Sequence, residues 1–389
     1  MALSQNNPFI LSTTKSIATS HATARPSSRR SGSVLVTKMA MAYEEGELER
    51  PKWAGQTPLS RLVGALLSIK PLSAVLKLGA RQVLISTAEK KNIPWREIRK
   101  EILESDVYKE IESIQNPSIV YPDYYRSPFH GYDEGNLSWM EKVCAASAET
   151  EMLKQKIQKQ KTQEAAAEAE PATMSMVRRS LPNVASLEEG IQILRGNVLK
   201  TITQQHQTYS GKSVIDDILD IGCSVGVSTR FLADSFPSAK VSGLDLSPHF
   251  LSVAQFKEKK SAPRKNPITW IHANGEDTGL PSKSYDLITI SFVIHECPER
   301  AIVGLIKEAS RLLKPGGTIA LTDIAPKSKI LQELSPVLFT LLKSTEPFLD
   351  EYYLTDLEGR LKEAGFLHIQ SLLTDPRHRT VTATAPPSV

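Results

Sequence analysis

Short apolar runs alternate with longer amphipathic runs between residues 215 and 324, and this alternation constrains the fold most strongly. Strands are expected at 215–221, 239–245, 268–272, 286–292 and 318–324, with helices at 227–236, 248–259 and 299–313. Strands separated by helices indicate a parallel sheet covered on both faces. Segments 366–373 and 379–385 read as a closing hairpin. We therefore predict an α/β fold, a doubly wound, mostly parallel, seven-stranded sheet with a C-terminal antiparallel hairpin.

The first strand runs directly into a glycine-containing turn, D-I-G-C-S-V-G over residues 220–226. Ligands of doubly wound sheets bind beyond the carboxyl ends of the strands, where such a turn lies. The glycine spacing alone is compatible with a dinucleotide phosphate, another nucleoside or simply a packed helix. A dinucleotide fingerprint needs G-x-G-x-x-G, and its third glycine is missing here. Asp220, just before the first glycine, suits the ammonium of an amino acid better than a pyrophosphate.

Polar residues also follow the later strands. Asp245 ends the second strand, where a carboxylate can accept both hydroxyls of a ribose. Asn274 follows the third strand, and its amide can pair with an adenine edge. His295 follows the fourth strand, where a histidine can accept a phenol or enol proton near neutral pH. The alternative for His295 is a structural role in its loop, through packing or a hydrogen bond.

Four motifs occur in order: D-I-G-C-S-V-G, G-L-D-L-S, Y-D-L-I-T and L-L-K-P-G-G. Together they resemble a class I S-adenosylmethionine-dependent methyltransferase of the ubiquinone/menaquinone-biosynthesis type (type 11), over roughly residues 180–385. The upstream segment N-P-S-I-V-Y-P-D-Y-Y is similar to a plastid and cyanobacterial branch. The resemblance implies that S-adenosylmethionine is the cofactor. Its expected contacts are the methionine part at Asp220, Gly222, Ser224 and Gly226, the ribose at Asp245, the adenine at Leu246, Asn274 and Gly275, and the methionine amino end at Ser291.

Two of these positions depart from the family pattern. Ser224 replaces the middle glycine of D-x-G-x-G-x-G, which is tolerable if its φ is negative. Asn274 replaces the acid that usually faces adenine, and it still offers an acceptor. We expect cofactor binding to survive both changes.

The acceptor is expected to be a small, lipophilic or aromatic molecule that is C- or O-methylated. The chain lacks the N/D-P-P-Y motif of amide and adenine methylases. It also lacks the Pro-Cys pair of cytosine methylases, because Cys297 precedes Pro298. Two apolar, aromatic segments, 121–139 and 325–353, are candidates to cover the substrate, although ordinary core packing also explains them. His295 is the candidate catalytic base. Two alternatives remain: a methyltransferase-fold binding or assembly protein without activity, and a nicotinamide-dependent oxidoreductase.

The N-terminal 43 residues have the composition of an organelle transit peptide. They contain Lys15, Arg25, Arg29, Arg30 and Lys38, many Ser and Thr, and no Asp or Glu. We expect a plastid presequence here, and a mature protein in the chloroplast, in the stroma or at the thylakoid or plastoglobule surface. The rest of the chain has 42 basic and 43 acidic residues, so no global basic surface is expected to bind nucleic acid.

The remaining N-terminal half divides by composition. Residues 44–140 are expected to form a helical and aromatic region, 141–177 a charged, solvated helix or linker, and 178–389 the methyltransferase domain. Residues 52–88 are basic and apolar with Pro71 between two helical pieces, which suits either an anionic membrane surface or a cap on the main domain. The cysteines, Cys144, Cys223 and Cys297, lack zinc-ligand spacing, and no metal site is expected.

Overall fold

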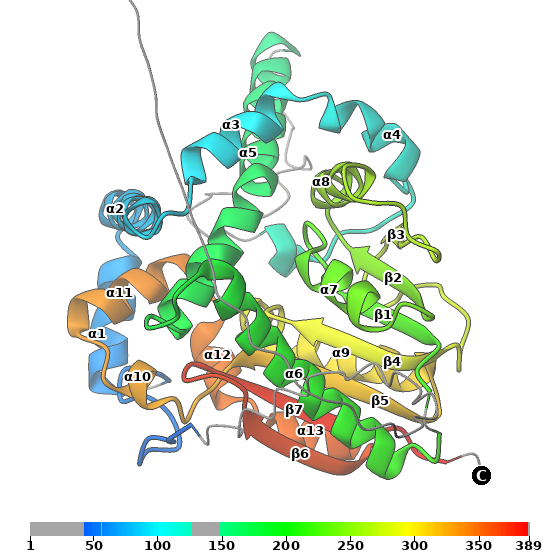
Figure 1. The fold of residues 1–389 in the computed structure, drawn as a ribbon. Helices are drawn as coiled ribbons and strands as arrows, with labels where there is room; N and C mark the ends of the chain where they lie inside the picture. The colour runs from blue at the N-terminus through cyan, green and yellow to red at the C-terminus, as the bar shows by residue number, and fades with distance from the viewer. Residues whose placement is uncertain (1–42, 56, 127–147, 213, 388–389) are drawn as a thin grey trace, which may run out of the picture. The chain divides into compact units, whose positions relative to one another are not determined.

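The computed structural model describes residues 43–55, 57–126, 148–212 and 214–387. Within them, seven strands form one sheet in the order β3-β2-β1-β4-β5-β7-β6 (Figure 1). The strands are β1 (Asp217–Ile221), β2 (Lys240–Asp245), β3 (Thr269–His272), β4 (Tyr285–Ser291), β5 (Leu313–Ile324), β6 (Leu367–Leu373) and β7 (His378–Thr384). Only β7 runs antiparallel, against both β5 and β6. The predicted fold class is confirmed, although β5 begins five residues earlier than expected.

Two layers of helices bury the two faces of this sheet. The helices of the domain are α6 (Leu187–Tyr209), α7 (Val227–Ser235), α8 (Pro248–Lys259), α9 (Glu299–Leu312) and α13 (Leu357–Glu363). Neighbouring strand residues belong to different cores: Ile218 packs with the α6 and α7 side chains, and Leu219 with those of α9 and α13. This two-residue alternation explains why the parallel strands are apolar throughout.

Helix α6 begins with a capping box. The Ser186 hydroxyl accepts the N–H of Glu189 at 3.0 Å, and the Glu189 carboxylate accepts the N–H of Ala185 at 2.9 Å. These two bonds satisfy N–H groups that have no partner within the helix. Helix α6 then runs along β5 and β7 (Figure 1), so its inward face reaches the centre of the sheet.

The N-terminal region is helical, with α1 (Pro58–Leu67), α2 (Lys70–Lys90), α3 (Trp95–Glu104), α4 (Ile111–Ile114) and α5 (Ala148–Ser180). Pro71 lies in the first turn of α2, where it costs no hydrogen bond. The expectation of a solvated helix is wrong for part of α5: Ala165, Ala166 and Ala167 are buried with Ile102 of α3. Alanine side chains are small enough for the two helices to approach closely, so they form a buried face without large apolar residues. The domain boundaries themselves stay predictions.

An insertion between β5 and α13 contains α10 (Lys329–Gln332), α11 (Pro336–Thr345) and α12 (Leu349–Leu354). Trp53 ties it to the N-terminal region: its ring stacks on Phe339 and meets Tyr353 edge-on, both with centroids 5.6 Å apart. Its indole N–H donates to the Leu331 carbonyl at 2.9 Å. The residues just before α1 therefore pack on the main domain. Among the described residues, no helix is long and apolar enough to span a bilayer.

Residues 1–42 and 127–147 lie outside the description. They include nearly all of the expected presequence, Cys144 and the second part of the aromatic segment 121–139.

Candidate cofactor and methyl-transfer site

The turn between β1 and α7 has a left-handed backbone at three of the predicted cofactor residues. The φ angles are 71° at Gly222, 51° at Ser224 and 74° at Gly226. A Cβ at Gly226 would lie 2.4 Å from the Trp270 ring, so only glycine fits there without a shift. The condition that Ser224 has a negative φ is wrong. Its left-handed backbone turns its N–H toward Asp245, which accepts it at 2.8 Å.

Asp220 supports this turn from inside the protein. Its side chain is almost completely buried, and its two oxygens accept the hydroxyls of Thr229 and Thr289, each at 2.7 Å. Burial raises the pKa of Asp220, while these two hydrogen bonds and Arg195 act against that rise. Direct contact between Asp220 and a ligand ammonium stays a prediction, because both oxygens already have protein partners.

Asp245 lies at the end of β2, beside the end of β3. Its second oxygen accepts the N–H of Ser247 at 2.8 Å. Burial raises the pKa of Asp245 to about 6, and the N–H donors of Ser247 and Ser224 limit the rise. Leu246 follows at once, and its carbonyl accepts a hydrogen bond from the His272 ring at 2.9 Å. Asp245 is thus a buried carboxylate oriented by two backbone amides.

Asn274 and Gly275 follow β3 in a tight turn. The Asn274 side-chain oxygen accepts the N–H of Glu276 at 3.0 Å, so one of its acceptor positions is used within the loop. A Cβ on Gly275 would lie 2.7 Å from Ile221 and 2.8 Å from Leu305. The Gly275 position therefore requires glycine for packing against the core, whether or not a ligand approaches it.

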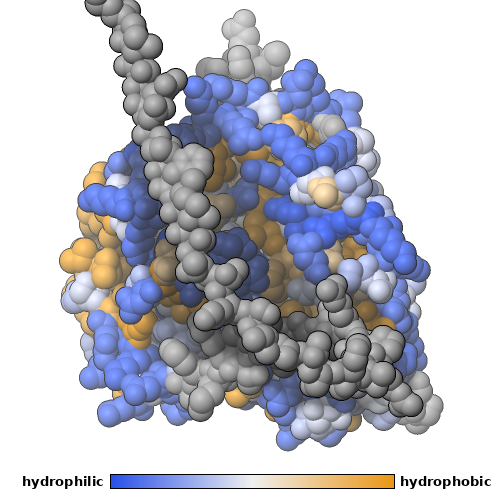
Figure 2. All heavy atoms as spheres, viewed as in Figure 1, coloured by the Kyte–Doolittle hydropathy of each residue, from blue (hydrophilic) through white to orange (hydrophobic). Residues whose placement is uncertain are grey.

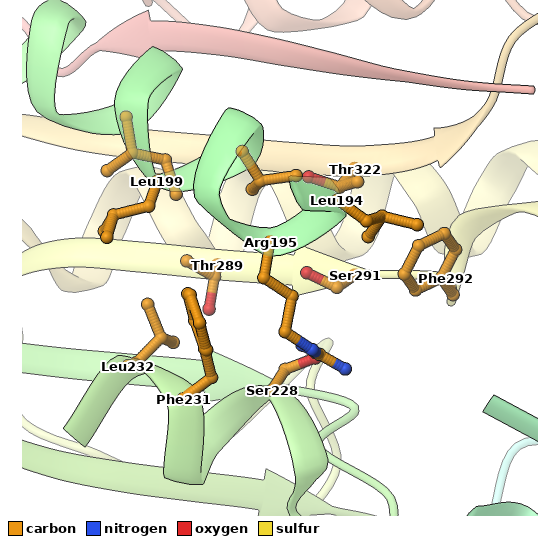
Figure 3. Close-up of a pocket in the computed structure, with 12 residues that line it drawn as sticks. Leu194, Arg195, Leu199, Ser228, Phe231, Leu232, Thr289, Ser291, Phe292 and Thr322 are labelled. Atoms are coloured by element: carbon orange, nitrogen blue, oxygen red, sulfur yellow. The ribbon is translucent and has the colours of Figure 1, made fainter. Parts of the chain in front are cut away.

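A small cavity of about 30 Å³ lies between α6, α7 and the ends of β4 and β5. Arg195 extends from α6 toward Ser228 of α7, with Ser291 and Phe292 beside it (Figure 3). Its Nη1 donates to the Ser228 hydroxyl at 2.8 Å, while its Nε has no hydrogen-bond partner among the described residues. Burial lowers the pKa of Arg195 to about 10, so it stays a cation at neutral pH.

The charge of Asp220 stabilises the Arg195 cation, but both Asp220 oxygens accept threonine hydroxyls, so Arg195 keeps donor capacity that a ligand anion can use. Ser291, expected at the methionine amino end, lines the same cavity. Arg195 can therefore hold a carboxylate such as that of the methionine part of the cofactor. Sequence reasoning missed this residue, although its spacing from Val198 and Ile202 places it on the buried face of an amphipathic helix.

Phe292, directly after Ser291, has a φ of 59°. Such a backbone is a genuine outlier for a bulky residue, and strained residues of this kind cluster at functional sites. The ring lines the cavity and meets the His378 ring edge-on at 5.0 Å. The strained residue thus separates the Arg195 cavity from the buried side chains of the hairpin.

His295 lies in the short helical turn Ile294–Glu296 after β4, between two acids. Its Nδ1 is 2.7 Å from Asp323 Oδ1, and its Nε2 is 4.0 Å from Glu346 Oε2. Burial alone would lower the pKa of His295, but the charges of Asp323 and Glu346 outweigh it and raise the pKa to about 10. The ring is therefore an imidazolium at neutral pH. Asp323, at the end of β5, was not anticipated from the sequence.

The protonated state changes the chemistry available to His295. An imidazolium cannot accept a proton, whereas it can donate a charged hydrogen bond to a phenolate or enolate. A role for His295 in catalysis stays a prediction, and this geometry favours a charged donor over a free base. Across the part of the chain that the structure describes, no three His, Cys, Asp or Glu side chains gather as around a metal ion.

Comparison with known proteins places this geometry in a family. The sequence profile described as "Methyltransferase domain" matches residues 218–317. A demethylmenaquinone methyltransferase of Tropheryma whipplei is 32% identical over 172 residues, which cover 40% of this chain and 68% of that protein. An uncharacterized methyltransferase of Synechocystis is 31% identical over 156 residues, covering 40% of this chain and 69% of that one.

Among solved structures, phosphoethanolamine N-methyltransferase 2 of Haemonchus contortus, in complex with S-adenosyl-L-methionine, aligns with a TM-score of 0.37 and 17% identity. The alignment covers 55% of this chain and 60% of that one. The sequence relationships carry the assignment: this chain belongs to the class I S-adenosylmethionine-dependent methyltransferases of the menaquinone and ubiquinone type, with S-adenosylmethionine as its cofactor.

Proposed function

We propose that this methyltransferase acts on a small lipophilic or aromatic acceptor, which it methylates at a carbon or an oxygen. The observation that carries the proposal is the His295–Asp323 pair, buried beside the end of β4 and next to the insertion that follows β5. A positive ring in this position suits an acceptor that reacts as a phenolate or enolate. The name of the Tropheryma relative, a demethylmenaquinone methyltransferase, supports a ring-containing acceptor.

Different residues of the chain act on the cofactor and on the acceptor. Arg195 and the β1–α7 turn bind and orient the methionine part of the cofactor, which supplies a methyl group on a positively charged sulfur. His295 stabilises the oxygen anion of the acceptor, and Asp323 keeps the ring protonated and oriented. The aromatic residues of the insertion, among them Phe339, Tyr352 and Tyr353, exclude water around this region. Positioning and charge then provide the rate gain.

Incubation with methyl-labelled S-adenosylmethionine and a plastid extract tests the acceptor class. We expect label in the lipid and phenolic fraction, and about 10²-fold less with His295→Ala. Label in protein or RNA alone would contradict a small-molecule acceptor. Metabolite profiling of a null mutant should reveal the accumulated unmethylated precursor and thereby name the acceptor.

We also propose that the protein is imported into the chloroplast. The acid-free, Ser- and Arg-containing composition of residues 1–43 supports this location, and cleavage is expected near residues 38–43 because Glu44 is the first acid. N-terminal sequencing of the protein from isolated plastids checks the cleavage. An intact Met1, or a cytosolic C-terminal fluorescent fusion, would contradict import.

The outer face of α1, α2 and α11 is a candidate membrane contact. Figure 2 shows hydrophobic residues gathered where α1 and α11 lie in Figure 1. Leu62 is 59% exposed, Val75 66%, Leu78 67% and Val337 68%. No acid occurs between Glu49 and Glu89, so the charged side chains of this stretch are all positive, which suits contact with anionic lipid.

Flotation with anionic vesicles tests this contact. We expect the mature chain to float with them and Leu62→Glu/Val75→Glu to float less. Leu367→Glu, at an exposed leucine of β6 outside these three helices, serves as the control. Binding that is equal for all three proteins would contradict the assignment of this face.

A further inference from the structure

A tyrosine-rich segment from the N-terminal region lies on the loops that follow β2 and β3. We call residues Asn116–Tyr125 the tyrosine strap. The N–H of Asn116 donates to Nδ1 of His272 at 2.8 Å, and the Tyr121 hydroxyl lies 3.2 Å from Nε2 of the same ring. The Tyr124 hydroxyl donates to Glu276 at 2.6 Å. The strap precedes the matched methyltransferase region by about a hundred residues, yet three polar contacts hold it there.

His272 connects the strap to the turn that follows β2. Because Nδ1 accepts the N–H of Asn116, the proton of the neutral ring is on Nε2. This proton is donated to the carbonyl of Leu246 at 2.9 Å and is shared with the Tyr121 hydroxyl oxygen at 3.2 Å. Burial lowers the pKa of His272, which keeps the ring neutral and this arrangement intact. One imidazole thus fixes the strap and the Asp245–Leu246 turn against each other.

The strap tyrosines share the electrostatic environment of Asp245. Burial, followed by the charge of Asp245, raises the pKa of Tyr121 to about 12. The same two causes raise the pKa of Tyr125 well above its ordinary value, and Glu296 adds to the rise. The rings of Tyr121 and Tyr125 are stacked, with centroids 6.4 Å apart and planes 10° apart. Two parallel aromatic rings therefore accompany the carboxylate assigned to the ribose.

The other end of the strap reaches the acceptor side. The Tyr124 ring meets Phe348 of the insertion edge-on at 6.3 Å, and the Arg300 guanidinium lies 5.3 Å from its centroid. Tyr124 thus contacts the loop after β3 through its hydroxyl and the insertion through its ring. A displacement of the strap would disturb both places at once.

We propose that the tyrosine strap is a wall of the cofactor site, which closes over the adenosine part of S-adenosylmethionine, with His272 as a positioning residue. Aromatic rings offer a flat apolar surface to a nucleoside, and the hydroxyls of Tyr121 and Tyr125 remain protonated and uncharged beside Asp245. The residues needed for tight cofactor binding then extend far upstream of the methyltransferase domain. This inference rests on the assignment of Asp245 and Leu246 to the cofactor, and it is independent of the acceptor.

Calorimetric titration of the full chain with S-adenosylmethionine tests the wall. We expect Tyr121→Phe/Tyr124→Phe to bind the cofactor about 10-fold more weakly, because the two hydroxyl contacts that hold the strap are lost. Tyr209→Phe is the matched control: the Tyr209 hydroxyl accepts a hydrogen bond from Gln370 of β6 at 3.2 Å, at the other edge of the sheet from β2 and β3. The control variant should have a melting temperature lowered about as much as that of Tyr121→Phe/Tyr124→Phe, yet bind the cofactor with wild-type affinity.

A second pair of variants leaves the polar contacts in place. Tyr125→Ala should weaken cofactor binding, and Tyr125→Phe should restore it, because the ring supplies the surface. Hydrogen exchange of residues 116–125 should slow when S-adenosylmethionine is added to the wild-type chain. Unchanged affinity in the folded Tyr121→Phe/Tyr124→Phe and Tyr125→Ala variants, or equal exchange with and without cofactor, would overturn the proposal. Failure to methylate any lipophilic acceptor would instead contradict only the proposed function.

Discussion

Replacing Asp245 by Asn tests the carboxylate that is predicted to bind the ribose of the cofactor. Its two oxygens each accept one backbone N–H, from Ser224 and Ser247, at 2.8 Å. An ionised carboxylate has about four acceptor positions, so about two remain for the paired hydroxyls of a ribose. Asn keeps the shape but loses the charge and one acceptor oxygen. We expect the affinity for S-adenosylmethionine to fall about 10- to 150-fold, which corresponds to roughly 1.5–3 kcal/mol.

The same substitution should not destabilise the cofactor-free protein at neutral pH. Burial raises the pKa of Asp245 from 3.8 to about 6, so ionising it in the folded chain costs about 3 kcal/mol. Because folding raises this pKa, the stabilising contribution of Asp245 is fully present below about pH 4 and is lost as the pH rises through about 6. The Asn variant has no such loss. Its free energy of unfolding should therefore depend less on pH over this window.

Calorimetry with S-adenosylmethionine and urea unfolding between about pH 4 and 8 measure the two effects. Asp217→Asn is the control, since Asp217 pairs with Lys314 at the opposite end of β1. A variant Asp245→Asn that binds cofactor as tightly as the wild type would refute the ribose assignment. A large loss of stability at neutral pH would show that the two N–H bonds outweigh the cost of burial.

Three further predictions test the rest of the site. His295→Ala should lower kcat about 10²-fold, and the wild-type kcat should fall as the pH rises through about 10. Asp323→Asn should move this fall in kcat to lower pH, because the carboxylate that raises the pKa of His295 loses its charge. An unchanged pH profile of kcat would assign His295 a structural role. Arg195→Met should weaken cofactor binding about 10- to 100-fold without lowering the stability of the cofactor-free chain, as calorimetry and urea unfolding can show. Gly226→Ala should lower the free energy of unfolding by about 1–3 kcal/mol more than Gly279→Ala. Gly279 is the control because its φ is similar, while a Cβ there would meet open space. Equal losses would mean that the structure relieves the contact between the Cβ added at Gly226 and Trp270.

The order and type of the sheet elements could be predicted because they depend on local patterns. Apolar runs of strand length, separated by capped amphipathic helices, admit little else than a doubly wound sheet. Helix α8 has the predicted bounds, 248–259, since Ser247 caps it and Pro248 begins it. The glycine turn and Asp245 were placed at the same edge by topology alone, because parallel strands present their carboxyl ends together.

The charge states and the cross-chain contacts of the site depended on the tertiary structure. A histidine after β4 was predictable, but its protonation depends on Asp323 and Glu346, which folding brings beside it. The backbone of Ser224 could not be predicted, since a left-handed serine is stabilised by the carboxylate that accepts its N–H. A role for Arg195 in cofactor binding can be inferred only from its burial beside Ser291.

Sequence by itself therefore determined the family, the cofactor and the edge of the sheet where the cofactor is expected. The family and the cofactor followed from the resemblance of four short motifs, and the sheet edge was predictable because propensity, periodicity and turn chemistry act over a few residues. Tertiary structure alone decided that Tyr121 and Tyr124 lie on His272 and Glu276, about 150 residues away along the chain. Contacts over such separations leave no periodic signal in a single sequence, because they depend on how packed elements bring their loops together.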